Sequence, residues 1–206
     1  GKTAFLGLTR LRSLNLHRSY RNFFDHDAFQ DLISLSSLKL SMNDLSDFSS
    51  LRTHILPELS TLNLEETASS VEQLDNVLDH AFLPKLNQLN LRLVKIEAKE
   101  ASRLNLWFAK IPHLRKLRMH WRADKISSAP RNMSGLLLPP ALVCINLSHQ
   151  GGMIFPDKFF SQFSNLQVLV LYYTAGYETQ TPAKRVALGL ADEVEWMENN
   201  AKIYPC

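Results

Sequence analysis

Apolar and polar positions along this 206-residue chain follow one short frame that recurs through most of its length. The frame is Leu-x-x-Leu-x-Leu, and successive copies start 24 to 28 residues apart. Its middle position holds Leu14, Leu38, Leu62, Leu89, Leu117, Ile145 and Leu169. Seven framed copies at nearly constant spacing indicate a repeat protein rather than a chance match.

Each copy predicts a short strand followed by a helix. The Leu-x-Leu alternation has the two-residue period of a strand, with the leucines on one face and the intervening residues on the other. After the strand, the apolar residues change to helical spacing. The three clearest helical sets are Leu45, Phe48, Leu51 and Ile55; Val71, Leu74, Leu78 and Phe82; and Ala101, Leu104, Phe108 and Ile111. Neither element can bury its apolar side alone, so we expect the units to stack and share one core.

Prolines mark the return from a helix to the next strand. They occur in Leu-Pro-x-Leu at 56–59 and 83–86 and in Ile-Pro-x-Leu at 111–114. Proline ends a helix there because it lacks the amide proton and restricts the residue before it. A Leu-Asn-Leu at 104–106 lies inside a predicted helix and is a chance match of letters. The asparagines of the strands, including Asn146, are expected on the solvent face of a parallel sheet.

Two segments depart from the frame. Residues 123–141 have no helical period and two proline sites, so we expect an irregular loop or a single turn there. Residues 183–199 predict a helix that caps the last repeat. Its apolar face would hold Val186, Leu190, Val194 and Met197. The chain starts almost directly on a strand, so that end of the stack is expected to be exposed or covered by sequence not present here. We predict a single domain over 1–206, with about seven repeats, that is part of a longer protein.

These residues carry a resemblance to a known family. The whole chain resembles an irregular leucine-rich-repeat solenoid of the ribonuclease-inhibitor-like class, which implies an α/β fold with a curved parallel sheet on the concave side and helices on the convex side. The units "VEQLDNVLDHAFLPKLNQLNL" and "EAKEASRLNLWFAKIPHLRKLRM" resemble the repeats of F-box leucine-rich-repeat proteins. In that family an amino-terminal F-box docks a Skp adaptor of a cullin ubiquitin ligase, and the repeats hold the substrate. No F-box pattern precedes Leu11, so Skp binding would need sequence not present here.

Composition narrows the class of protein. With 45% hydrophobic and 21% charged residues, the chain has the balance of an ordinary globular protein. A net charge of +3 is too small to predict nucleic-acid binding by itself. Two cysteines are too few for a disulfide framework, and no apolar run reaches the roughly 20 residues that span a bilayer. We therefore expect a cytoplasmic or nuclear protein without a membrane span.

The solvent face of the sheet is the predicted binding site. Such faces bind partners in solenoids because they are extended and their side chains have no role in the core. We predict a protein partner on this concave face. The residues assigned to partner binding are Asn63, Asn90, Arg92, Lys116, Arg118, His120, Asn146 and Tyr172. The alternative is a plain hydrated face, with the actual contacts on loops or at the rim.

Two clusters on this face have competing interpretations. A basic cluster runs from Arg92 through Lys116 to Arg122. It would bind an acidic peptide, a phosphate or a nucleic-acid backbone, or it is an ordinary solvated surface. An aromatic cluster around Tyr172 would anchor a partner, or it packs beneath a neighbouring loop or the terminal helix.

Nothing in the sequence predicts catalysis, a metal or a cofactor. The seven histidines are scattered among different repeats without ligand spacing, and Cys144 has no recognisable His or Asp partner. We therefore expect a noncatalytic recognition module, specifically the substrate-binding repeats of an F-box-type ubiquitin ligase adaptor. Two alternatives stay open: the sensing domain of a nucleotide-binding immune-type receptor, and an RNA-associated solenoid that uses the basic cluster.

Overall fold

The computed structural model describes two compact units of the chain. Unit 1 comprises residues 1–95 and unit 2 comprises residues 96–206. The described residues are 4–18, 27–42, 55–67, 74, 83–92, 101–120, 131–132, 135–147, 153–171, 182–190 and 195–197. No helix within these ranges is long and apolar enough to cross a membrane.

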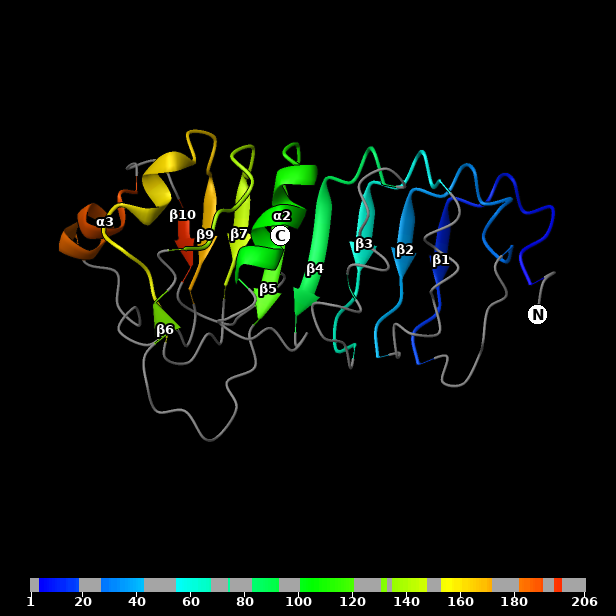
Figure 1. Cartoon of the computed structure of the whole chain (residues 1–206), viewed down its shortest axis with the longest axis horizontal. Coiled ribbons are helices and arrows are strands. Elements are labelled where there is room, and N and C mark those ends of the chain that lie inside the picture. The colour runs from blue at the N-terminus through cyan, green and yellow to red at the C-terminus, as the bar shows by residue number, and fades with distance from the viewer. Residues whose placement is uncertain are drawn as a thin grey trace. The chain divides into compact units, whose positions relative to one another are not determined.

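Unit 1 is built on parallel strands that follow one another in chain order. They are β1 (Ser13–Asn15), β2 (Ser37–Lys39), β3 (Thr61–Asn63) and β4 (Gln88–Arg92). Figure 1 shows them side by side. Their register aligns Leu14 with Leu38, Leu38 with Leu62, and Leu62 with Leu89. The middle positions of the repeat frame therefore form one row, as the spacing predicts.

The leucines of unit 1 fill a core, and the residues between them do not. Leu38, Leu62 and Leu89 are 1 to 2% exposed, and Leu40 and Leu64 are fully buried. The polar residues between them stay half-buried. Burying one leucine side chain contributes about 1.5 to 3 kcal/mol. A row of equivalent leucines can thus hold strands of only three to five residues.

The first turn of unit 1 is more exposed than the next. Leu14 on β1 and Leu16 just after it are half-buried, whereas their equivalents in the next two repeats are buried. Leu6 and Leu8, which precede β1, are 58% and 44% exposed. Within the described residues, the first turn of unit 1 is therefore less buried than the second.

Tight turns, rather than helices alone, lead into the strands. The amide of Leu32 donates to the carbonyl of Phe29, and the amide of Leu35 donates to that of Leu32, both at 3.1 Å. This i to i+3 pattern places every third side chain on the same side. The sequence carries the signal as Phe-x-x-Leu-x-x-Leu-x-x-Leu at 29–38, which the helical interpretation overlooked. The same hydrogen bond recurs at Leu59 to Leu56, Leu86 to Leu83, Leu114 to Ile111 and Leu166 to Phe163.

Unit 2 repeats the parallel arrangement. Its main strands are β5 (Lys116–His120), β7 (Cys144–Asn146), β9 (Val168–Val170) and β10 (Glu195–Met197). They lie in that order, and the register aligns Leu117 with Ile145 and Ile145 with Leu169. A second, small parallel sheet pairs β6 (Arg131–Asn132) with β8 (Met153–Ile154). The segment 123–141 was predicted as a loop or turn, so β6 is an addition to that prediction.

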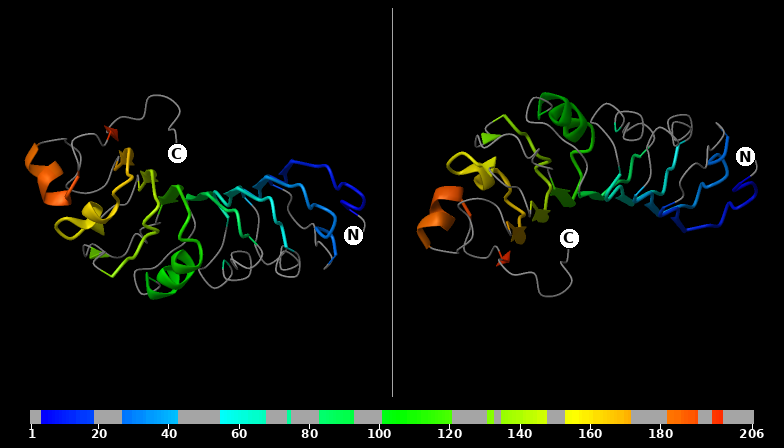
Figure 2. Two further views of the ribbon diagram at one scale, coloured as in Figure 1. Left: turned by 90° about the horizontal axis from the view of Figure 1, so that it is seen from above. Right: turned by 90° about the horizontal axis from the view of Figure 1, so that it is seen from below.

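Helical segments cover one side of the main strands in unit 2. Figure 2 shows α2 (Ala101–Lys110) and the 3₁₀ helix η3 (Phe159–Gln162) on the same side of β5, β7 and β9. The helix predicted after the fourth strand is therefore present, and Leu104 and Phe108 bury its apolar face. Of the helices predicted over 45–55 and 71–82, only Ile55 and Leu74 lie within the described residues. Leu74 is helical and buried, as predicted, whereas Ile55 is not helical and is 58% exposed.

A phenylalanine cluster packs around η3. Phe155, Phe159, Phe160 and Phe163 are all buried, and their ring centroids lie 5.0 to 6.3 Å apart. Offset and edge-to-face aromatic pairs at this spacing stabilise beyond simple burial. The sequence marks the cluster as Phe-x-x-x-Phe-Phe-x-x-Phe at 155–163, the repeat that departs most from the helical pattern.

The predicted capping helix over 183–199 is wrong in its second half. Helix α3 (Pro182–Leu188) ends at Gly189, and Glu195–Met197 form β10 instead. Gly189 has φ +70°, and its amide donates to Val186 while that of Leu190 donates to Arg185. This pair of hydrogen bonds with a left-handed glycine terminates a helix. The chain then pairs in parallel with β9, which places Trp196 opposite Leu169.

Candidate functional site

The outward face of the unit 1 sheet presents rows of polar side chains. The row before the core leucines contains Ser37, Thr61 and Gln88, and the row after them contains Lys39, Asn63 and Asn90. All six are half-buried, so each is partly accessible. Parallel strands at about 4.8 Å spacing make these rows continuous. Of the predicted site residues, the structure brings Asn63, Asn90 and Arg92 together here.

The asparagines of this face share one hydrogen bond to the backbone, at the last residue of β1 and β3 and at the middle residue of β4. The Oδ1 atoms of Asn15, Asn63 and Asn90 each accept a hydrogen bond from the amide two residues later, at 2.9 to 3.0 Å. Asparagine side chains make this local bond to the backbone readily. The recurrence of Leu-Asn-Leu therefore has a structural cause besides any role in binding. Sequence alone placed these residues on the right face but did not indicate this bond.

A left-handed residue follows each of the first three strands. Arg18, Met42 and Glu66 have φ of 55°, 60° and 59°. Their amides donate to the carbonyls of Ser41, Glu65 and Arg92 in the next repeat. Neighbouring turns are thus tied together at the same point, which keeps the outward rows in register.

Arg92 is engaged by an acid of the neighbouring turn. Its Nη1 donates to Oε1 of Glu65 at 2.7 Å, and Nδ2 of Asn90 donates to Oε2 of the same carboxylate at 3.4 Å. The side chains of Arg92 and Glu65 are 35% and 20% exposed. The predicted basic cluster therefore has an acid at its Arg92 end. That weakens it as a site for a phosphate backbone.

The ion pair between Glu65 and Arg92 is expected to show a coupling of about 1 kcal/mol. A double-mutant cycle with Glu65→Gln and Arg92→Gln, read from urea unfolding, measures it. The pair between Glu58 and Lys85 is a matched control, since its N to O distance is also 2.7 Å but its side chains are 50% and 59% exposed. We expect a smaller coupling there because solvent screens it. Equal couplings in both pairs would show that burial does not strengthen the Glu65–Arg92 contact.

In unit 2 the predicted site residues divide into accessible and buried ones. Lys116 and Arg118 are half-buried on β5, and the register sets them opposite Cys144 and Asn146. Asn146 is 2% exposed, so the prediction that its side chain is accessible to solvent is wrong. The strand next to it explains part of this, because Val170 aligns with Asn146 and is fully buried. The sheet face is apolar at that point.

The structure says less about the predicted site residues His120 and Tyr172 and about Arg122 of the basic cluster. The backbone of β5 places His120 two residues beyond Arg118, on the same face of the strand. Tyr172 and Arg122 lie outside the described residues, so the proposed aromatic anchor and the far end of the basic cluster stay predictions. Arg92 belongs to unit 1 and Lys116 to unit 2.

Cys144 is 3% exposed and disulfide-bonded. The sequence has one other cysteine, Cys206, which lies outside the described residues. Two cysteines were judged too few for a disulfide framework, so the sequence did not indicate a bonded Cys144.

Thiol titration checks the disulfide directly. The denatured, unreduced protein is expected to contain no free thiol, and reduction should release two per chain because the sequence has two cysteines. In a Cys144→Ser variant the unreduced protein should instead show a single free thiol. Two free thiols before reduction would contradict the bond.

The described residues offer no group of three His, Cys, Asp or Glu side chains arranged to hold a metal ion. What the geometry does offer is an extended polar face on a parallel sheet, with its asparagine side chains held by local hydrogen bonds. Such a face suits recognition of another surface.

Comparison with solved structures finds matches at low sequence identity. Internalin C2 from Listeria monocytogenes is 19% identical with a TM-score of 0.53, over 89% of this chain and 70% of that chain. Internalin InlF from the same organism is 17% identical with a TM-score of 0.48, over 92% of this chain and 54% of that chain. The Toll–Spatzle complex of Drosophila gives 14% identity and a TM-score of 0.46, over 81% of this chain and 20% of that chain.

No protein-family model matches the chain, and no curated protein matches it. The likeness to internalin C2 therefore concerns the fold: a parallel-sheet solenoid made of leucine-rich repeats.

Proposed function

We propose that this leucine-rich-repeat solenoid is a noncatalytic module that recognises a protein partner through the outward face of its sheet. The observation that carries the proposal is the regular row of half-buried polar side chains on β2, β3 and β4. These side chains lie opposite the buried leucines, so they can vary without disturbing the core. A rigid, extended surface of this kind loses little conformational entropy on binding.

Protein is favoured over nucleic acid as the partner by the charges of this face. The rows of unit 1 carry Lys39 and Arg92 but also Glu65, which pairs with Arg92. Nucleic-acid binding needs several unpaired cations that follow the phosphate backbone. A mixed face of amides, hydroxyls and paired charges is typical of the polar part of a protein interface.

A finer proposal is that the repeats belong to an F-box-type ubiquitin ligase adaptor. It is based on the sequence resemblance of the units at 71–91 and 97–119 to repeats of that family. Purification of the full-length protein from its own cells tests it, with Skp and cullin subunits expected among the bound proteins. Their absence would remove the adaptor role and leave the recognition module in place.

The recognition face is tested by altering side chains that serve neither the core nor a strand end. In a Lys39→Glu, Thr61→Arg double variant, a reversed charge and a bulky cation would occupy the middle of the face. Partners crosslinked to the native protein are expected to bind this variant at least about tenfold more weakly, a loss of about 1.4 kcal/mol. Thermal unfolding should change little, because both positions are half-buried and outward.

A charge swap elsewhere on unit 1 provides the control. Glu58→Lys with Lys85→Glu keeps the net charge and an exposed ion pair away from the outward rows. This variant should bind as the native protein does. If the Lys39→Glu, Thr61→Arg variant also retains full binding, the outward face is not the recognition surface.

A further inference from the structure

Unit 2 contains a cavity at the edge where its main strands begin. Its volume is about 430 Å³, which lies in the range of small-ligand sites. One wall is formed by Arg115, Val143 and Gln167, which immediately precede β5, β7 and β9. The amide of Val143 donates to the carbonyl of Arg115, and that of Gln167 donates to Val143, both at 2.8 Å. This ladder sets the three side chains in a row.

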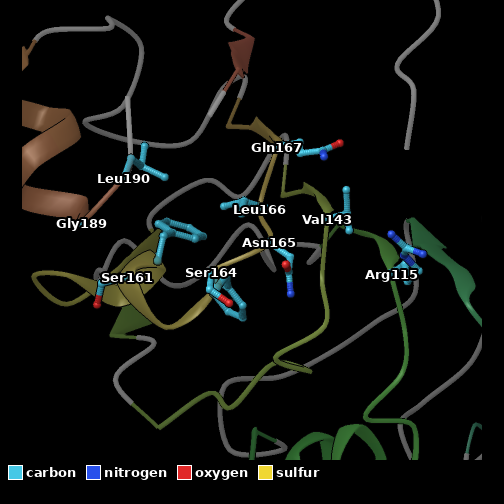
Figure 3. A pocket seen from close by; sticks show the side chains of 11 residues that line it. Arg115, Val143, Ser161, Ser164, Asn165, Leu166, Gln167, Gly189 and Leu190 are labelled. Carbon is cyan, nitrogen blue, oxygen red and sulfur yellow. The ribbon is translucent and has the colours of Figure 1, made fainter. Parts of the chain in front are cut away.

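Apolar side chains of η3 and the turn after it contribute to the opposite side of the cavity. Phe160, Phe163 and Leu166 are 2 to 6% exposed, and they bring ring and methyl groups to the cavity from η3 and the turn that follows it. Gly189 and Leu190 close one end, where α3 stops. Figure 3 shows Leu190 at one end of the cavity and Arg115 at the other. The site therefore has an apolar end and a cationic end.

Polar groups also line the cavity. Arg115 is exposed, and among the described residues no side chain pairs with its guanidinium. Ser164, Asn165 and Gln167 add hydroxyl and amide donors along the cavity. The described lining residues include no acid, so the cation is not neutralised from within the cavity. An unpaired guanidinium with neighbouring amide donors is suited to a planar anion.

We propose that this cavity binds a carboxylate attached to an apolar group, with the carboxylate at Arg115 and the apolar group against Phe160, Leu166 and Leu190. A carboxylate fits because one guanidinium can hold both of its oxygens, whereas a phosphate usually recruits several cations. Two sources supply this chemistry: the free carboxyl terminus of a protein ending in an apolar residue, or a small aromatic acid. The site is separate from the outward face, so it goes beyond the proposed function.

Calorimetric titration with matched probes tests the site. The probes are a hexapeptide ending in a free phenylalanine carboxylate, the same peptide as its carboxy-terminal amide, 3-phenylpropionate and inorganic phosphate. The free-acid peptide is expected to bind at least about tenfold more tightly than the amide, since a charge-assisted hydrogen bond is lost in the amide. Phenylpropionate binding as tightly as the peptide would identify a small acid as the ligand, and weaker binding would identify a protein terminus.

Three variants locate the binding. Arg115→Gln should weaken the free-acid probe at least about tenfold and leave the amide probe unchanged. Arg12→Gln is the matched control, because Arg12 is exposed and its carbonyl accepts the equivalent ladder bonds of unit 1. Ser164→Trp should abolish binding of both peptides by filling the cavity, and circular dichroism checks that it folds.

The proposal is overturned by any of four results. These are no binding of the free-acid peptide or of phenylpropionate at millimolar concentration, equal binding of acid and amide, phosphate binding as tightly as the free acid, or full binding by Arg115→Gln. None of them bears on the outward face, whose variants lie in unit 1.

Discussion

Replacing Leu117 by alanine is expected to lower the free energy of unfolding by about 3 kcal/mol, within the range of 2 to 5 for buried leucines. Leu117 is fully buried on β5 and is aligned with Ile145 on β7. The substitution removes methyl groups from the inner row and leaves a cavity between consecutive turns. Neighbouring strands cannot close it, because the ladder hydrogen bonds fix their spacing.

Leu106→Ala is the matched control for Leu117→Ala. Both leucines lie in unit 2, but Leu106 is 66% exposed on α2. Its substitution should change stability by less than about 0.5 kcal/mol. Urea unfolding followed by far-ultraviolet circular dichroism measures both variants. Similar losses in the two variants would contradict the assignment of Leu117 to the shared core row.

Gly189→Ala should cost about 2 to 4 kcal/mol, by two separate effects. The residue has φ +70°, a conformation that costs an alanine about 1 kcal/mol. A Cβ at this position would also lie 2.9 Å from the Cα of Lys158 and 2.9 Å from the Cβ of Ser161. The contact with Lys158 cannot be relieved by a rotamer change, because it is with backbone. The amide of Lys158 donates to Ala187 at 2.6 Å, so movement of either segment would strain that bond.

Two other glycines separate these effects. Gly7 has φ +75° with no heavy atom within 4 Å of the added Cβ, so Gly7→Ala should cost only the conformational part. Gly135 has open space and no positive φ, so Gly135→Ala should be close to neutral. The expected order of destabilisation in urea unfolding is Gly189, then Gly7, then Gly135. A loss at Gly189 no larger than at Gly7 would mean that α3 and η3 are not closely packed.

The outward face of unit 1 shows which parts of the candidate site could be predicted from the local sequence pattern. Alternation along a strand states which residues share a face, so the outward positions of Asn63, Asn90 and Arg92 could be predicted. Their bonding partners could not be predicted in full. The contact of Arg92 with Glu65 joins residues in different turns, and its geometry depends on how those turns stack.

The sequence contained a signal for the end of a helix within 183–199, but the prediction gave more weight to the helical spacing of the apolar residues. The apolar spacing over 183–199 matches a helix, yet Gly189 lies in its middle and adopts the left-handed conformation that ends helices. Periodicity favoured one long helix, and pairing with β9 favoured a strand at Glu195–Met197. Main-chain hydrogen bonds to a neighbouring strand outweighed the local helical preference there.

By itself, the sequence determined the parallel repeat, the inward row of leucines and helix α2, because each of these follows from spacing between residues close in the chain. Only the tertiary structure decided the burial of Asn146, the bonded state of Cys144, the strand at Glu195–Met197 and the cavity beside Arg115. The reason is physical. These features arise where residues from separate turns meet. The sequence of one turn does not specify which residues of the next turn pack against it.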